Sequence, residues 1–219
     1  MEYSPDNIPV ITIDGPAGAG KGTIAGLLAD RLGWHLLDSG AIYRAAALET
    51  LKQCIALNDP QVIIDTLNKM DVRFVGGKVY SGDEDVSLEI RTPECAGMTS
   101  KIAAIPAVRE ALLDRQRAFA ALPGLIADGR DMGTVVFPEA KLKIFLTASP
   151  EIRGERRFKQ LSEQGISANL ATLIDEIAAR DERDAGRAIA PLHPADDAIS
   201  IDSSRMAPEE VLEMISKFL

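Results

Sequence analysis

The chain has 219 residues, of which 46% are hydrophobic and 26% charged, and its net charge is −9. This length and composition predict a globular chain with a full core, and the acidic balance argues against a duplex nucleic-acid binder. The only cysteines, Cys54 and Cys95, are too few for a disulfide framework or a zinc site. The N-terminus lacks a signal-peptide pattern and no apolar run has membrane-spanning length, so we expect a cytoplasmic protein.

A glycine-rich segment follows the first predicted strand. Residues 10–13 form an apolar, β-branched run typical of a buried parallel strand, and residues 23–29 have the apolar spacing of a helix. The sequence of residues 14–23 between them is DGPAGAGKGT. Strand, glycine-rich turn and helix are the context of a phosphate-binding loop, where backbone N–H groups and the helix N-terminus surround an anion.

Two side chains of this loop have predicted roles. Lys21 can reach the β- and γ-phosphates of a nucleotide, and Thr23 is the expected hydroxyl ligand of Mg²⁺. A purely structural turn is disfavoured because the lysine, the threonine and the flanking elements agree, although Gly22 replaces the usual Ser or Thr after the lysine. The residues expected to hold the donor nucleotide in this loop are Gly15, Pro16, Ala17, Gly18, Ala19, Gly20, Lys21, Gly22 and Thr23.

A second short strand is predicted over residues 34–38, and a helix follows it. Ligands in open α/β sheets bind beyond the carboxyl ends of the strands, so Ser39 and Arg44 are expected near the phosphate-binding loop. The alternative is that Ser39 only caps the helix and that Arg44 is a surface cation. The sequence leaves both interpretations open.

An antiparallel insertion is predicted between the second strand and the rest of the sheet. A helix over residues 60–70 precedes alternating strands at 71–75 and 78–81 around a Gly-Gly turn, with a short third strand at 85–87. Residues 68–71 match the N-K-x-D pattern of guanine recognition, but they end a helix, so we interpret the match as coincidence.

Two helices follow the insertion. Thr92 caps the first, which has Pro93 in its first turn, and the second begins after Pro106. The arginines that the second helix carries are Arg109, Arg115 and Arg117.

A core strand over residues 125–128 ends in a carboxylate. An aspartate in the position of Asp128, beside a phosphate-binding loop, is the expected partner of Mg²⁺. Arg130 and Asp131 follow at the end of this central strand, where a ligand is expected. The alternative for Arg130 and Asp131 is a structural salt bridge.

Residues 150–188 are predicted to form a helical lid after a further strand at 141–146. The arginines of its first helix are Arg153, Arg156 and Arg157, and Arg180, Asp184 and Arg187 share one face of its second helix. A charged helix face is usually solvated, but these cations have no other evident partner in an acidic chain, which favours closure over a polyphosphate. A last strand at 198–202 and a helix from Pro208 complete the chain.

The predicted fold class is α/β: a parallel sheet with a phosphate-binding loop, flanked by helices, with a small inserted antiparallel β patch and a helical lid. The absence of repeats, low-complexity tracts and linkers predicts one domain over residues 1–219, with an insertion at about 60–105 and the lid at about 150–188.

Four segments of the chain resemble bacterial cytidylate kinases, namely residues 15–23, 37–44, 127–136 and 180–184. The resemblance runs nearly end to end and includes the inserted hairpin, which becomes the nucleoside monophosphate-binding region. It implies an ATP-dependent kinase that uses Mg²⁺ and converts CMP or dCMP into CDP or dCDP in pyrimidine nucleotide salvage. It also implies a cytoplasmic monomer without nucleic-acid or membrane partners.

The resemblance further implies roles for individual side chains. Cytosine would be contacted by Ser39, Arg109 and Asp131, of which Ser39 and Arg109 can donate to the acceptors of the base. Arg44 and Arg130 would hold the acceptor phosphate. The ribose would be approached by Ser100, Arg180 and Asp184. Arg187 would approach the transferring phosphoryl group, and Arg157 would contact ATP. The implied catalytic set is Lys21, Asp128, Arg130 and Arg187.

The chemistry of the chain agrees with this implication. His35 and His193 do not stand out as catalytic bases, and a phosphate monoester needs none because it is already an anionic nucleophile. The alternative from another class is a GTP-hydrolysing switch, which predicts a guanine-reading motif after a core strand and few arginines for an acceptor. A kinase of UMP or AMP is the nearer alternative.

Overall fold

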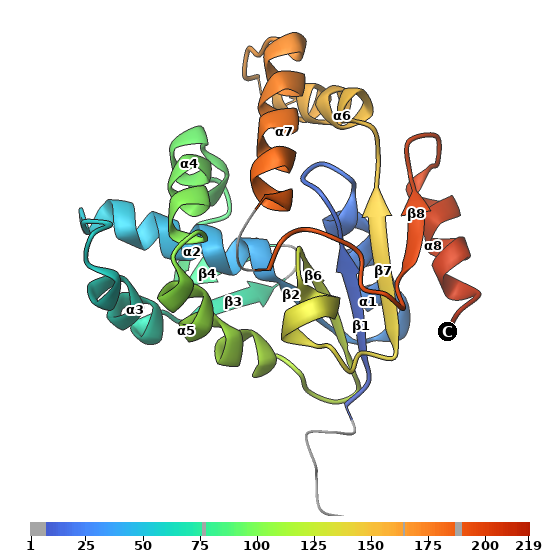
Figure 1. Cartoon of the computed structure of the whole chain (residues 1–219), viewed down its shortest axis with the longest axis horizontal. Helices are drawn as coiled ribbons and strands as arrows, with labels where there is room; N and C mark the ends of the chain where they lie inside the picture. Colours follow the sequence, from blue (N-terminus) through green and yellow to red (C-terminus); the bar gives the residue numbers. More distant parts are fainter. Residues whose placement is uncertain (1–7, 76–77, 164, 187–189) are drawn as a thin grey trace, which may run out of the picture. The chain divides into compact units, whose positions relative to one another are not determined.

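The computed structural model describes residues 8–75, 78–163, 165–186 and 190–219 (Figure 1). The chain folds into two compact units, one from residues 1–35 and 122–219 and the other from residues 36–121. Within the described residues, no helix combines the length and the apolar character that crossing a membrane requires.

The first unit contains the predicted parallel sheet. β1 (Val10–Asp14) pairs in parallel with β6 (Leu125–Gly129) on one side and with β7 (Leu142–Thr147) on the other, and β8 (Ile199–Asp202) pairs with β7. The strand order is β2-β6-β1-β7-β8, and the edge strand β2 (His35–Asp38) begins at the last residue of this unit. The sheet therefore confirms the predicted fold class.

Both faces of the central strands are covered. α1 (Lys21–Leu32) packs against β1, β6 and α8 (Pro208–Ser216), whereas the unpredicted π-helix Met132–Val136 packs against β1. Figure 1 shows α1 behind the sheet and this short helix in front of it. Ile11 and Ile13 are at most 2% exposed. A strand buried on both faces has a continuous apolar sequence, which explains the run that predicted β1.

Two long helices follow β7 in the first unit. α6 (Pro150–Glu163) and α7 (Leu170–Ala185) pack against each other, as Figure 1 shows beyond the end of β7. A Cβ at Gly154 would lie 2.4 Å from Ile174 Cγ1, so the glycine permits this close packing. α7 ends at Ala185, and Arg187 lies outside the described residues.

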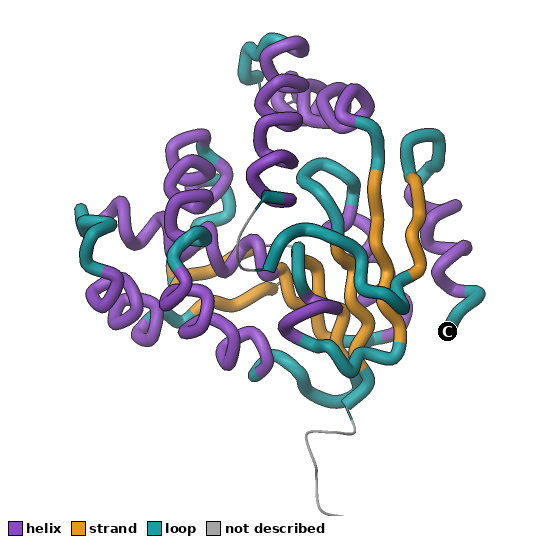
Figure 2. The backbone as a smooth tube through the Cα atoms, in the orientation of Figure 1, coloured by secondary structure: helices purple, strands orange, loops and turns teal. Residues whose placement is uncertain are grey.

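The second unit consists mainly of helices (Figure 2). α2 (Ser39–Lys52) packs against α4 (Pro93–Ile102), and α3 (Pro60–Lys69) packs against α5 (Pro106–Arg117). Arg115 of α5 donates to the Leu67 carbonyl at 2.6 Å and also to the Met70 carbonyl, so it satisfies groups at the C-terminal end of α3. The N-K-x-D match at residues 68–71 spans the C-terminal end of α3. This position agrees with the interpretation that the match to a guanine-recognition pattern is a coincidence.

The predicted antiparallel patch is also part of the second unit. β3 (Val72–Val75) pairs with β4 (Lys78–Ser81), which pairs with β5 (Glu84–Asp85). Val75 opposes Lys78, and the Gly-Gly turn between them lies outside the described residues. The third strand begins one residue earlier than predicted, and a short 3-10 helix, Glu89–Arg91, leads to the predicted Thr92 cap, where Thr92 Oγ1 accepts from Cys95 N at 3.2 Å.

Candidate active site

The phosphate-binding loop connects β1 to α1. Gly20 precedes the helix in the left-handed conformation, with φ 93°, and has no side chain with which to cap it. The N–H groups of the first helical turn consequently face the loop, where they can bind an anion with the help of the helix dipole. This arrangement is the predicted one.

Lys21 lies at the centre of this loop. Its Nζ donates to the Pro16 carbonyl at 2.9 Å and lies 3.9 Å from Asp128 Oδ1, at the end of β6. The lysine is 6% exposed. The ammonium group is therefore held between the loop backbone and a carboxylate, within reach of the position that the loop offers to phosphates.

Asp14, which sequence analysis missed, joins the loop to the segment after β6. Its Oδ1 accepts from Met132 N and its Oδ2 from Gly133 N, each at 2.8 Å. The pKa of the Asp14 carboxyl is raised from 3.8 to about 6. Burial is the main cause and the charge of Asp131 adds to it, whereas the two backbone hydrogen bonds lower the pKa and partly offset the rise. The strand that precedes the loop thereby fixes the backbone beside Asp131.

We predict that Asp14 makes the stability of the chain depend on pH. Because its pKa is raised in the folded state, the folded chain keeps a proton that the unfolded chain releases between pH about 4 and 6, so this contribution to stability is lost as pH rises through that window. Asp14→Asn removes the titration. Urea unfolding from pH 4 to pH 7 should show the stability of the wild type falling relative to the variant by about 2 kcal/mol. A difference that does not vary with pH would contradict this role.

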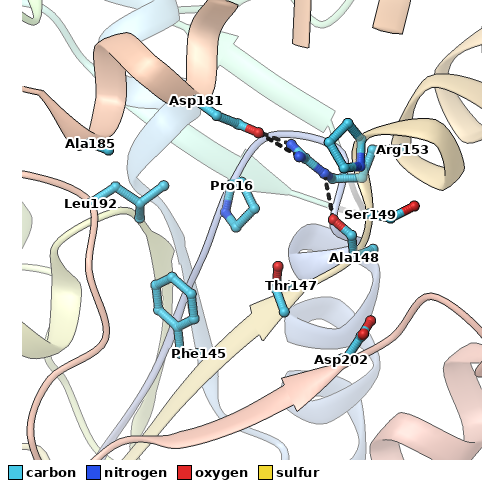
Figure 3. A pocket seen from close by; sticks show the side chains of 11 residues that line it. Pro16, Phe145, Thr147, Ala148, Ser149, Arg153, Asp181, Ala185, Leu192 and Asp202 are labelled. Carbon is cyan, nitrogen blue, oxygen red and sulfur yellow. Dashed lines mark hydrogen bonds and ion pairs between the residues drawn. The ribbon is translucent and has the colours of Figure 1, made fainter. Parts of the chain in front are cut away.

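Arg153 connects α6, α7 and the phosphate-binding loop. It is 3% exposed, and Figure 3 shows its guanidinium between the Ala148 carbonyl and the Asp181 carboxylate of α7. Its Nε donates to Ala148 O at 2.8 Å, and its Nη1 donates to Ala17 O at 3.1 Å and to Asp181 Oδ1 at 3.0 Å. A second bond from Nη2 to the same carboxylate makes the pair bidentate. α7 is thus tied to the loop backbone.

Arg156 makes a second link to the loop. It donates to the carbonyls of Ala19 at 3.3 Å and Ser203 at 2.7 Å, and Ser203 Oγ also donates to Ala19 O at 3.1 Å. Arg157, which the resemblance implied at ATP, donates to Gln160 Oε1 at 2.8 Å in this structure. The premise that the lid cations have no other partner is therefore wrong for Arg153, Arg156 and Arg157, because carbonyls, a carboxylate and an amide already bind them.

A cavity of about 440 Å³ lies beside the loop. Pro16, Arg153 and Asp181 line it together with residues at the ends of β7 and β8 (Figure 3). The other residues that line it are Phe145, Thr147, Ala148, Ser149, Pro150, Ala185, Leu192 and Asp202. Its wall combines apolar side chains with the Arg153–Asp181 pair, the Asp202 carboxylate and the hydroxyls of Thr147 and Ser149.

Arg130 and Asp184 form an ion pair across the first unit. Arg130 Nε lies 3.2 Å from Asp184 Oδ2, and Arg180 Nε lies 4.0 Å from the same oxygen. The carboxylate that pairs with Arg130 here is thus that of Asp184, on α7. Asp184 is 2% exposed and Asp131 7% exposed, and the pairing with Arg130 holds the buried Asp184 carboxylate in place.

Two predicted residues of the second unit have side-chain partners there. The N-cap of α2 is Asp38, whose Oδ1 accepts from Ala41 N at 2.7 Å and whose Oδ2 accepts from Arg44 Nη2 at 3.0 Å. The interpretation of Ser39 as the cap is wrong, because Ser39 is the first residue of the helix and donates instead to Gln116 Oε1 at 2.6 Å. Arg44 is half-buried and not a free surface cation.

The remaining predicted residues of this unit lie on α4 and α5. Ser100 Oγ donates to the Ala96 carbonyl at 3.3 Å within α4, and Arg109 is half-buried on α5, one helical turn before Leu112. Gln116, which sequence analysis missed, follows on the same helix. An interior glutamine gives no pattern that a single sequence would reveal.

The first unit has the parts of a phosphotransferase: a phosphate-binding loop with its lysine, a strand-end aspartate and two arginine-bearing helices. The family model described as cytidylate kinase matches residues 11–219. A cytidylate kinase from Colwellia psychrerythraea is 55% identical over 97% of this chain and 96% of its own. One from Aeromonas hydrophila is 56% identical over 95% and 92%, and one from Klebsiella pneumoniae 56% over 94% and 93%. The chain belongs to the cytidylate kinase family.

Proposed function

We propose that the chain transfers the γ-phosphoryl group of ATP to CMP or dCMP, giving ADP and CDP or dCDP. The observation that carries this proposal is the family match over residues 11–219, together with a phosphate-binding loop whose Lys21 is held between Pro16 O and Asp128. The reaction fits pyrimidine nucleotide salvage. A cytoplasmic monomer without nucleic-acid or membrane partners is proposed with it, on the family resemblance.

The donor phosphates are bound by the loop backbone and Lys21. The backbone N–H groups of the loop, to which Pro16 contributes none, surround the β- and γ-phosphates, and Lys21 exchanges its bond to Pro16 O for the phosphate oxygens. Arg156 and Ser203 fix the Ala19 carbonyl and so hold the loop in shape. Arg157 is proposed at ATP by family resemblance only.

Mg²⁺ fits the oxygen donors at the loop. The metal takes few protein ligands and keeps phosphates and water in its coordination sphere. Asp128 Oδ2 lies 3.4 Å from where a Cβ of Gly22 would stand, so the carboxylate points at the helical turn that carries Thr23. No larger cluster of His, Cys, Asp and Glu suited to a metal occurs among the described residues. Thr23 and Asp128 would hold the ion, which neutralises charge on the phosphates when bound.

An oxygen of the CMP phosphate is the nucleophile. It forms a bond to the γ-phosphorus as the bond from that phosphorus to the β–γ bridging oxygen breaks, and ADP leaves with the electron pair of that bond. No proton has to be removed from the nucleophile. The protein aligns the two anions and neutralises their repulsion, for which Lys21, Arg44, Arg130 and the arginine at position 187 supply cations.

The acceptor nucleotide is proposed to be bound by polar and charged side chains. The residues that we propose to contact it are Ser39, Arg44, Ser100, Arg109, Arg130, Asp131, Arg180, Asp184 and Arg187. The burial of Asp131 and the pairing of Arg130 and Arg180 with Asp184 support the proposal, because pre-positioned charges lose little freedom on binding. Asp131 is proposed to accept from the exocyclic amino group of cytosine.

We predict that Asp131→Asn reduces the preference for CMP over UMP. A carboxylate accepts from cytosine N4 but repels uracil O4, and a hydrogen bond to a charged group contributes about 1.5–3 kcal/mol. The ratio of kcat/KM for CMP to that for UMP should fall roughly ten- to hundredfold, mainly because kcat/KM for CMP falls. Asp83→Asn, at a fully exposed position, is the matched control. An unchanged ratio in a folded Asp131→Asn protein would remove Asp131 from base recognition.

α6 and α7 are proposed to act as a lid over the nucleotides. The cations of these helices have partners in this structure, so closure would exchange bonds such as that of Arg157 to Gln160 for bonds to phosphate. Hydrogen exchange of amides in residues 150–186 should slow when ATP and CMP analogues bind together. Equal exchange with and without them would rule out the lid.

A further inference from the structure

Ser39 and Gln116 form a buried hydrogen-bonded pair in the second unit. Ser39 Oγ lies 2.6 Å from Gln116 Oε1, and the two residues are 4% and 3% exposed. Gln116 Nε2 also donates to the Leu112 carbonyl, one turn earlier on α5, at 3.1 Å. Three polar groups on two helices are thus connected in a row.

The direction of each hydrogen bond in this row is fixed by chemistry. The Leu112 carbonyl can only accept, so the amide nitrogen of Gln116 has to face it. The amide oxygen then faces Ser39, and since that oxygen also only accepts, the hydroxyl proton of Ser39 has to point at it. The reversed amide would oppose two oxygens at the Leu112 end and leave a buried repulsion.

This direction leaves Ser39 as an acceptor. A free serine hydroxyl offers one donor and two lone pairs, but the donor of Ser39 is committed to Gln116 and only the lone pairs remain for a ligand. In this structure the Ser39 proton is therefore directed at Gln116, whereas the resemblance implied that Ser39 donates to the base. Cytosine presents a donor at N4, whereas uracil presents the acceptor O4 at that position.

We propose that Gln116 is a specificity-determining positioning residue, which orients the Ser39 hydroxyl proton so that Ser39 accepts from an exocyclic amino group and disfavours a carbonyl there. The substrate class is a pyrimidine nucleotide with a 4-amino group. The proposal rests on the proposed function, in which Ser39 contacts the base. Without Gln116 the hydroxyl could rotate and serve cytosine and uracil alike.

The primary test is Gln116→Met, which keeps the length of the side chain and removes both polar atoms. The ratio of kcat/KM for CMP to that for UMP should fall about three- to tenfold, mainly because kcat/KM for UMP rises. Gln116→Glu keeps an acceptor for Ser39 in either protonation state, so its ratio should stay within about twofold of the wild type. Gln53→Met, at an exposed position of the same unit, is the control. If the role of Gln116 is purely structural, Gln116→Met would lower kcat/KM for CMP and for UMP by the same factor and leave their ratio unchanged. That result would overturn the proposal.

A double-mutant comparison shows whether Gln116 acts through Ser39. In a Ser39→Ala background, Gln116→Met should leave the ratio unchanged, and a further fall would overturn the proposal. If Gln116→Met does not fold, Ser39→Ala decides alone: it should lower kcat/KM for CMP and leave or raise that for UMP. An equal or larger loss for UMP would show that Ser39 donates. A wild-type protein that does not phosphorylate CMP at all would instead refute the proposed function.

Discussion

Lys21→Ala should lower kcat/KM for phosphoryl transfer by roughly a hundred- to thousandfold while the chain stays folded. Removing one preorganised group that stabilises transition-state charge has costs of this size, and Lys21 is the ammonium group held inside the phosphate-binding loop, 2.9 Å from Pro16 O. The loop backbone remains in the variant, so ATP should still bind, with its affinity reduced. Initial rates with ATP and CMP measure the effect.

The control for this prediction is Lys217→Ala, which removes an exposed lysine after α8. It should leave the rate within about twofold, because an exposed charge remote from the reacting groups is screened. Turnover near the wild-type value in a folded Lys21→Ala protein would show that the lysine of the loop does not contribute to phosphoryl transfer.

Gly15→Ala should damage the loop itself. Gly15 has φ +146°, and a Cβ there would lie 1.9 Å from the Leu146 carbonyl oxygen of β7, so the backbone has to move. We expect the free energy of unfolding to fall by about 3 kcal/mol or more and ATP binding to be lost. Thermal melting and equilibrium binding of ATP measure the two effects.

Gly26→Ala is the matched control on the same strand–loop–helix segment. Gly26 is inside α1, and nothing lies within 4 Å of a Cβ at that position. Alanine there should raise the free energy of unfolding by about 0.5–1 kcal/mol, because it improves helix propensity without a clash. Equal stability of the Gly15 and Gly26 variants would contradict the close approach of the loop to β7.

The parts that were predictable are those with a local sequence signal. The β1–loop–α1 segment, the antiparallel patch and the Thr92 cap each follow from spacing, β-branched residues or turn chemistry within a few positions. The π-helix at Met132–Val136 has no such signal, because the Asp14 carboxylate, more than a hundred residues earlier, receives two of the backbone N–H groups there. A contact between segments that are so distant in sequence is set by packing.

The same distinction applies to the site. Lys21 and Asp128 were predictable because their motif and strand end fix their positions. Arg153 was misjudged because its partner, Asp181, is on another helix, and only the folded chain brings the two together with the Ala17 carbonyl. Ser39 was expected to cap α2 or to donate to the base, but its hydroxyl donates to Gln116, which comes from α5 and lies far from it in the sequence.

The central claim is that the chain phosphorylates CMP with ATP, and a coupled assay of ADP formation with a panel of nucleoside monophosphates tests it most directly. We predict that kcat/KM is highest for CMP and dCMP, at least about tenfold lower for UMP, and lower still for AMP. A highest value for UMP or AMP, or nucleotide hydrolysis that no monophosphate accelerates, would contradict the account.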